Sequence, residues 1–262
     1  MGGVRGGRLV RAGVLRVGAT RSEPKILAVA DTKRVLKVEL HAHTDQDPED
    51  RIPYSTQDLI DRAADLGYHA IAVTLHDRYF DPTPFAAYAR ERGVLLLSGI
   101  ERTIARRHVL LVNFGPESAA VRSFADLVRL KARSRGLVVA PHPFYPTTSA
   151  MGRDLDEQAA LVDAIEINAM YTRQIDFNRR AFVWARANSK PLVGNSDVHR
   201  LDQMGTTYSL VQTEPDPDAI CEAIRTGRVE VRTEPLPLTR AVLTFTRMVI
   251  GGVLGRLAGA GD

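Results

Sequence analysis

The chain has 262 residues, 44% of them hydrophobic and 25% charged, a balance typical of a soluble globular protein with room for one α/β domain. Its single cysteine, Cys221, excludes an internal disulfide, and its place in an apolar helical pattern favours a small buried residue over a nucleophile. The formal charge of +4 is uneven, because residues 1–34 contain eight Lys or Arg residues and two acids. The rest of the chain is slightly acidic, so we do not expect stable binding to duplex nucleic acid.

The two ends of the chain differ from its middle. Residues 1–34 are rich in Gly and Arg and lack the apolar stretch of a secretory signal, which predicts a flexible extension. A transit peptide, an upstream start codon and a basic tail that touches anionic surfaces are the alternatives. Residues 236–262 are apolar but interrupted by arginines and glycines, which favours a packed or interfacial helix over a membrane span, with membrane association the less favoured outcome. We expect a cytoplasmic protein whose folded domain covers residues 35–235.

Between these ends, strand-like apolar runs alternate with helical patterns. A capping box from Ser55 to Asp58 predicts the start of a helix that ends at Gly67. Further helices are expected over 85–92, 118–134, 155–162, 175–188 and 217–226. Strands are expected over 35–41, 70–75, 94–100, 108–114, 137–140, 164–167, 191–194, 207–212 and 228–232. This alternation favours a mostly parallel sheet covered by helices, in an open or barrel form, whose chemistry collects where strands end.

The first predicted strand ends in two histidines one residue apart. Because alternate residues of a strand point to the same face, His41 and His43 are expected to converge. Two converging imidazoles beside carboxylates are a common beginning of a metal site. Taken alone, the pair is more often an ordinary surface or core feature than a ligand pair.

Other potential ligands also stand at strand ends. They are Glu101, His76, His142, Asp197 and His199. Each has an ordinary reading by itself, since a histidine can be a hydrogen-bonded loop residue and an aspartate a helix cap. Their gathering at one rim favours a shared metal site, whereas His69 precedes a strand and is assigned to structure.

His108 begins a predicted strand instead of ending one. Only six residues separate it from Glu101, too few for a crossover helix, so this connection is predicted to be a hairpin. A hairpin returns the chain to the rim that it left, which would bring His108 close to Glu101.

These pieces resemble, in order, the motifs of the polymerase-and-histidinol-phosphatase (PHP) domain. The matching stretches are His41-Ala42-His43-Thr44, Thr74-Leu75-His76-Asp77, Gly99-Ile100-Glu101, His108-Val109-Leu110, Pro141-His142-Pro143 and Asn195-Ser196-Asp197-Val198-His199. The resemblance covers roughly residues 36–213 and implies an α/β fold, a distorted (β/α)7 barrel of TIM-like type. It also implies up to three metal ions at one rim and hydrolysis of phosphoesters.

Carried over position by position, the resemblance implies three sets of ligands. The first metal would be held by His41, His43, Glu101 and Asp197, and the second by Glu101, His108 and His142. The third would be held by His76 and His199 with a carboxylate of the following loop, for which Asp47 is chosen over Asp45 and Asp50. The family's Thr-Asp-His is Thr74-Leu75-His76 here, so the support of the missing aspartate is absent or comes from Asp77.

The resemblance and the residue types together predict a hydrolase. Imidazole and carboxylate ligands suit two to three Zn, Mn or Fe ions, which activate a bound water. Glu101, Asp197 and His199 are the candidate catalytic residues. The substrate would be an anionic phosphate ester of a metabolite, nucleotide or short oligonucleotide, bound by Arg78, Arg102 and Arg173, each of which alone is more often a surface charge. Hydrolysis of a carbon ester, carbamate or amide and a non-catalytic metal-binding module are the alternatives.

Overall fold

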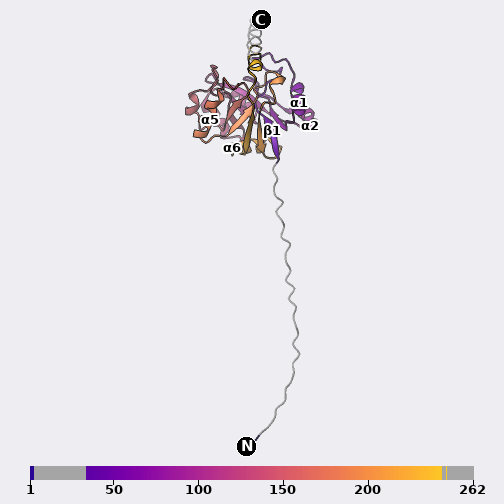
Figure 1. The fold of residues 1–262 in the computed structure, drawn as a ribbon, viewed down its shortest axis with the longest axis vertical. Helices are drawn as coiled ribbons and strands as arrows, with labels where there is room; N and C mark the ends of the chain where they lie inside the picture. Colours follow the sequence, from indigo (N-terminus) through magenta and orange to yellow (C-terminus); the bar gives the residue numbers. More distant parts are fainter. Residues whose placement is uncertain (3–33, 244–245, 247–262) are drawn as a thin grey trace. The chain divides into compact units, whose positions relative to one another are not determined.

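The computed structural model describes residues 1–2, 34–243 and 246 (Figure 1). The flexible extension predicted for residues 1–34 therefore lies almost wholly outside the described residues, and so does most of the predicted tail. The unit from Lys33 onward is the one described below. Among the described residues, no helix is both long and apolar enough to cross a membrane.

The predicted α/β class is confirmed, and the described residues form ten strands in two sheets of five. The first sheet has the order β10-β9-β1-β2-β3, formed by Val229–Thr233, Thr207–Gln212, Val35–Glu39, Ala70–Ala72 and Leu95–Leu97. Its β1, β2 and β3 are parallel, whereas β9 runs antiparallel to both β1 and β10. The second sheet has the order β4-β5-β6-β7-β8, formed by Gly99–Ile104, Arg107–Val112, Leu137–Ala140, Ala164–Asn168 and Leu192–Asn195. There β5 is antiparallel to β4 and β6, and the last three strands are parallel.

The predicted barrel would be a single closed sheet. The described strands instead form two separate sheets, and neither of them is closed. Isolated bridges nevertheless join segments of the two sheets, among them two parallel ones, between Ala42 and Val198 and between His76 and Glu101. Both bridges involve the segments that continue β1, β2 and β8 beyond their ladders. The two sheets are therefore hydrogen-bonded to each other at the end of the strands where the histidines lie.

The helices have the order expected, with shorter bounds. They are α1 (Thr56–Asp65), α2 (Ala86–Glu91), α3 (Phe124–Lys131), α4 (Asp154–Glu157), α5 (Asn178–Ala187) and α6 (Pro217–Arg225), with 3-10 turns at Thr83–Phe85, Pro116–Ala120 and Leu201–Gln203. Residues 238–243 of the predicted tail are helical as well. The capping box at Ser55 and Asp58 is confirmed. The continuous helix predicted over 118–134 is wrong, because a second capping box at Ser123 and Asp126 starts α3 only after an extended Val121.

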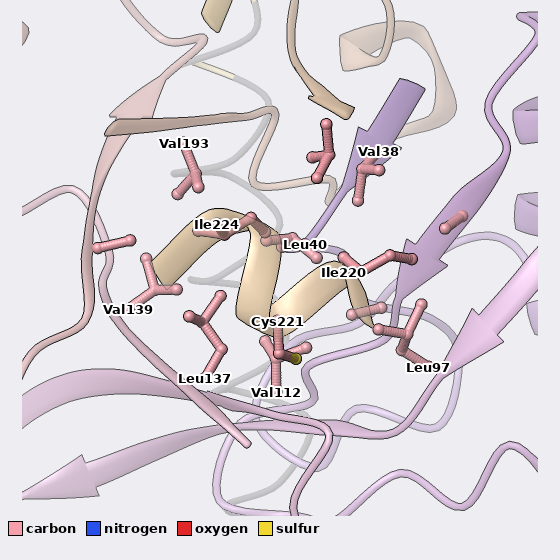
Figure 2. Packing of buried hydrophobic residues seen from close by; sticks show 14 of the residues in the cluster. Val38, Leu40, Leu97, Val112, Leu137, Val139, Val193, Ile220, Cys221 and Ile224 are labelled. Carbon is pink, nitrogen blue, oxygen red and sulfur yellow. The ribbon is translucent and has the colours of Figure 1, made fainter. Parts of the chain in front are cut away.

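Helix α6 packs into a core shared by both sheets (Figure 2). Ile220, Cys221 and Ile224 of α6 lie among apolar side chains from strands of each sheet. Cys221 is fully buried, as predicted. Arg225 of α6 donates to the carbonyls of Arg135 and Gly136 just before β6, so α6 covers the end of the strands opposite to His142, which follows β6.

Candidate metal centre

The two histidines of the opening motif lie side by side where β1 leaves its ladder. The parallel bridge holds this segment, because Val198 donates its amide to the carbonyl of His41 and accepts from the amide of His43. Both imidazoles are fully buried, with ring centroids 5.3 Å apart. The alternation that predicted their convergence thus places both rings at the end of the first sheet.

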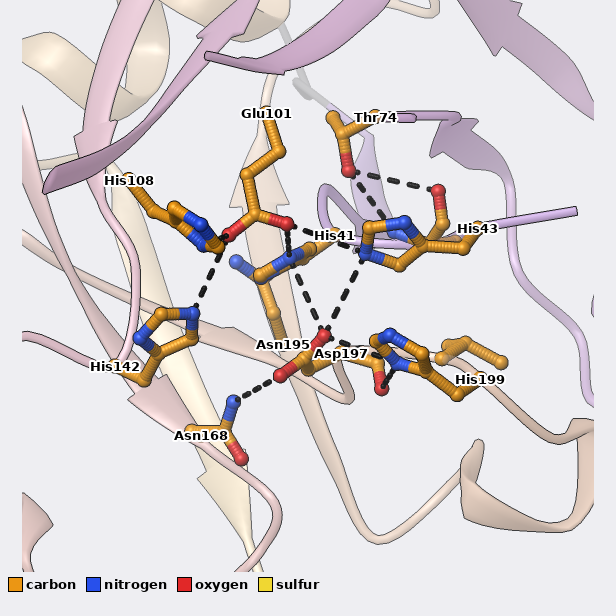
Figure 3. Close-up of polar contacts among 12 residues, drawn as sticks. His41, His43, Thr74, Glu101, His108, His142, Asn168, Asn195, Asp197 and His199 are labelled. Atoms are coloured by element: carbon orange, nitrogen blue, oxygen red, sulfur yellow. Dashed lines mark hydrogen bonds and ion pairs between the residues drawn. The ribbon is translucent and has the colours of Figure 1, made fainter. Parts of the chain in front are cut away.

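The carboxylate of Glu101 lies at the centre of the histidine cluster (Figure 3). Its Oε2 is 3.1 Å from His41 Nε2, 3.4 Å from His43 Nε2 and 3.3 Å from His76 Nε2. Its Oε1 is 2.6 Å from His108 Nδ1 and 3.3 Å from His142 Nε2. The predicted hairpin is confirmed as β4–β5, in which Thr103 pairs with His108, and it brings His108 onto Glu101.

Asp197 connects the opening histidines to His199. Its Oδ1 is 3.3 Å from His41 Nε2, 3.6 Å from His43 Nε2 and 3.3 Å from His199 Nδ1. Asp197 has a φ of +52° and His142 a φ of +30°, in the left-handed region that is costly for residues other than glycine. Such backbone strain gathers at functional sites, where the surrounding structure holds a side chain in a required direction.

The loop after His43 contributes two carboxylates, and they have different partners. Asp47 Oδ2 lies 2.8 Å from His43 Nδ1 and accepts from the amide of His76 at 2.9 Å. Asp50 Oδ2 lies 3.0 Å from His199 Nε2 and 3.9 Å from His76 Nδ1. Asp47 therefore supports two histidines from behind, while Asp50 is the loop carboxylate that approaches both His76 and His199. No contact of the Asp45 side chain with this cluster is seen in the described chain.

Glu166 is a site residue that the sequence reasoning missed. It stands in β7, is fully buried, and its Oε2 lies 2.8 Å from His41 Nδ1. Asn168 and Asn195 donate to its two oxygens at 2.9 and 3.0 Å, and the His142 amide donates at 3.1 Å. A carboxylate inside an otherwise apolar strand can be buried only if it is paired with other polar groups. The position of Glu166 between two isoleucines was therefore the sequence signal that could have identified it.

Glu39 is a second buried carboxylate that was missed. Its oxygens accept from the amide of Ser196 at 3.0 Å and from the amide of His41 at 3.1 Å. Burial raises its pKa to about 8, against the lowering effect of these amide hydrogen bonds and of His41. Glu39 thus ties β1 to the segment that carries Asp197, without a cationic side chain directly bonded to it in the described chain.

The pKa values of the central groups reflect close packing of opposite charges. Burial opposes the charged form of His41, but Asp197, Glu101 and Glu166 together raise its pKa well above the usual value. Burial likewise acts against ionisation of Glu101, yet the surrounding histidines lower its pKa well below the usual value. Because the pKa of Asp197 is also lowered well below its usual value, Glu101 and Asp197 are ionised and available as ligands at neutral pH.

The arginines predicted to contact substrate differ in their surroundings. Arg102 is buried, donates to the carbonyl of Val121 and pairs with Asp77, which corrects its assignment as a substrate contact. Because Asp77 pairs with Arg102, it does not take the place of the missing aspartate beside His76. Asp47 supports His76 instead, with its Oδ2 3.1 Å from His76 Nδ1. Arg78 is exposed and donates to the carbonyl of Gln46 in the loop of Asp47. Arg173 is exposed in the loop after β7.

His69 is used structurally, as expected, because its Nδ1 accepts from the amide of Lys37 in β1 at 2.9 Å. It also lines a groove beside the start of β1, away from the cluster of the other six histidines. His69 is thus the one histidine of the seven that lies outside the cluster.

The cluster fits divalent metal ions. Four overlapping groups of ligand atoms lie close enough for an ion: His41–His43–Asp197, His41–Glu101–His142, His76–Glu101–His108 and His43–His76–His199. Two ligand atoms bound to the same tetrahedral zinc ion are about 3.4 Å apart. Most of the distances between the carboxylate oxygens of Glu101 or Asp197 and the surrounding histidine nitrogens are close to this value. His43 Nε2 and His142 Nδ1 are also buried without a hydrogen-bond partner, which is unfavourable unless another group binds them.

The comparisons with known proteins agree with this fold. A family model described as PHP-associated matches residues 176–229, a segment that includes Asp197 and His199. No curated protein matches the sequence.

Several solved structures are similar at low sequence identity. One is a two-domain protein of Bacteroides vulgatus containing a predicted PHP-like metal-dependent phosphoesterase, with a TM-score of 0.60, 18% identity, and coverage of 83% of this chain and 71% of that one. Another is PsfC of Pseudomonas syringae, with a TM-score of 0.56, 19% identity, and coverage of 86% and 99%. A third is the lesion-specific endonuclease Q of Pyrococcus furiosus, with a TM-score of 0.53, 14% identity, and coverage of 76% and 58%.

Proposed function

We propose that this chain, a PHP-domain protein, is a metal-dependent phosphoesterase that hydrolyses a phosphate monoester or diester. The observation that carries the proposal is the position of Glu101, whose two carboxylate oxygens lie within 3.4 Å of five histidine side chains. A carboxylate in this position can bridge two ions, the arrangement that suits displacement at phosphorus. Cytoplasmic location is part of the proposal, supported by the single buried thiol of Cys221.

Two to three Zn, Mn or Fe ions would be held by the histidines together with Glu101, Asp197 and a carboxylate of the loop. When bound, they supply an activated water and positive charge for the phosphoryl group. Glu101 would contribute to holding more than one of these ions, because each of its oxygens faces different histidines, and Asp197 would hold the opening histidines and His199 in position. Asp50 supports the third site, because it is the loop carboxylate that contacts His199, at 3.0 Å, and it also lies 3.9 Å from His76 Nδ1.

The proposed substrate is anionic. Three divalent ions outweigh by one charge the five ionised carboxylates around them, which are Glu101, Asp197, Asp50, Asp47 and Glu166. A site filled with three ions would therefore carry net positive charge and favour a phosphate ester of a metabolite, nucleotide or short oligonucleotide. Arg78, exposed beside the metal loop, is the proposed phosphate contact, and Arg173 is a second candidate on the loop after β7. A relative in fold is named an endonuclease, which favours testing diesters as well as monoesters.

The test is a substrate panel with added Mn²⁺ or Zn²⁺, using p-nitrophenyl phosphate, bis-p-nitrophenyl phosphate and p-nitrophenyl acetate. We expect turnover of at least one phosphate ester, its loss on chelation, and its loss in Glu101→Gln with the fold intact by circular dichroism. Glu157→Gln, an exposed change in α4, is the matched control. Turnover of the acetate alone would assign the site to carbon esters, and metal binding without any turnover would favour a non-catalytic module.

A further inference from the structure

Strand β10 leaves one edge of the first sheet open. It is the terminal strand of its sheet, and within the described chain only β9 pairs with it. The amide of Gln212 donates to the carbonyl of Arg228, and the amide of Glu234 donates to the carbonyl of Thr206. These hydrogen bonds show which residues of β10 direct their backbone groups toward β9 and which direct them away from it. The backbone groups of Glu230 and Arg232 therefore face β9, whereas those of Val229, Val231 and Thr233 point outward. An outward row of this kind is a template for a further strand.

An apolar groove of about 650 Å³ runs beside this edge. Val229 and Val231 of β10 line one side, and Phe182 and Val183 of α5 line the other. Phe182 is 42% exposed and Val183 72% exposed, which is unusual for large apolar side chains of a helix that packs on a sheet. A strand added at the edge would direct alternate side chains toward these two residues.

The exposed face of β10 identifies the strand that fits. Glu230 and Arg232 are 62% and 55% exposed, stand on either side of Val231, and form an ion pair of 3.0 Å with each other within the chain. In an antiparallel pairing of two β10 strands about Val231, Glu230 of each copy lies opposite Arg232 of the other. A shift of the two-fold centre by one residue places Glu230 opposite Glu230 or Arg232 opposite Arg232, which is repulsive.

A two-fold axis at Val231 also gives hydrogen-bond partners to the outward backbone groups of β10. With Val231 opposite the second copy's Val231, the outward groups of Val229 meet those of the second copy's Thr233, and every outward residue of β10 takes part in the ladder. The two-fold axis places the exposed Phe182 and Val183 of both copies on the same side of the joined strands. We propose that this face is an isologous interface, in which two copies of the chain pair through β10 and bury the groove beside α5.

The oligomeric state tests the proposal, measured by light scattering on a sizing column and by sedimentation over about 1 to 100 μM protein. We expect a dimer for the native chain. Glu230→Arg alone and Arg232→Glu alone should each weaken the dimer by about tenfold or more, because each creates two like-charge pairs per interface. The double variant Glu230→Arg/Arg232→Glu should restore it, and the exposed control Arg122→Glu should leave it unchanged.

A cross-link tests the register independently. Glu230→Cys/Arg232→Cys should form a covalent dimer on mild oxidation, while each single-cysteine variant should not, and the native Cys221 is buried and does not interfere. A native chain that stays monomeric across the range would overturn the proposal. So would a dimer that both single charge reversals leave intact, which would place the interface elsewhere or assign the groove to a different partner.

Discussion

His41 Nδ1 lies 2.8 Å from Glu166 Oε2, on the side of the imidazole away from Glu101 and Asp197. With Nδ1–H donated to a carboxylate, the lone pair of Nε2 faces the centre of the cluster. Carboxylates behind ligand histidines fix the tautomer and ring orientation and make the ligand more basic. Glu166, itself held by two asparagines, is placed for this role.

Glu166→Gln should weaken metal binding without unfolding the protein. Removing the charge behind His41 is expected to lower the affinity for Zn²⁺ by about tenfold or more. Calorimetric titration of chelator-treated protein measures the change, with Glu157→Gln as a surface control. Equal affinity in the variant and the native chain would show that His41 does not depend on Glu166.

Substitution of Asp50 and substitution of Asp47 should reduce the amount of bound metal in different ways. Asp50→Asn is expected to remove about one equivalent, since Asp50 is the loop carboxylate that reaches both His76 and His199. Asp47→Asn should weaken binding more broadly, because Asp47 holds His43 and His76 in place. Metal content after dialysis, measured by plasma mass spectrometry, separates the two. Loss of one equivalent in Asp47→Asn, with none lost in Asp50→Asn, would return the third site to Asp47.

Glu39 should make the metal-free protein less stable as the pH rises. Its pKa is about 8 in the folded chain and near the ordinary 4.5 when unfolded, so the folded state holds this proton longer. The contribution of Glu39 to the free energy of unfolding is therefore present below about pH 4.5 and lost as the pH rises toward 8, by about 5 kcal/mol.

Urea unfolding at several pH values in the presence of chelator measures this loss, and Glu39→Gln isolates it. The raised pKa values of His41 and His43 act in the same direction, so the difference between native and variant chains is the informative quantity. A difference that does not vary with pH over this window would mean that Glu39 is ionised throughout.

Substitution of Arg102 should lower the stability of the fold, whereas substitution of Arg78 should weaken substrate binding. Arg102→Ala removes a buried guanidinium that pairs with the partly exposed Asp77 and donates to the carbonyl of Val121, and it is expected to lower the free energy of unfolding by about 1 to 3 kcal/mol. Arg78→Ala alters an exposed side chain and should change stability by no more than about 0.5 kcal/mol, while raising KM for a phosphate ester. Urea unfolding and steady-state kinetics on both variants check this, and an unchanged KM in Arg78→Ala would remove Arg78 from the proposed substrate contacts.

The order of the elements and the rim that carries the histidines could be predicted from the sequence because they depend on local signals. Strand-end positions located His41, His43 and Glu101, and a short connection predicted the hairpin of His108. Glu166 and Glu39 could not be found by spacing, since they lie inside strands and their partners come from distant segments. The break before α3 was readable, because Ser123 and Asp126 repeat the capping signal of Ser55 and Asp58. The division into two sheets depends on long-range pairing that periodicity does not encode.

The burial of Cys221 between the two sheets makes its thiol a reporter of their separation. A reagent such as 5,5′-dithiobis(2-nitrobenzoate) can reach this sulfur only when the core opens, so its reaction rate follows the opening equilibrium. His41 and His43 follow β1 of the first sheet, whereas Glu101 and His108 lie in the second sheet and His142 follows its strand β6. Ions bound between them clamp the sheets at the far end, so slower labelling of Cys221 on adding Zn²⁺ would measure that clamping without any substrate.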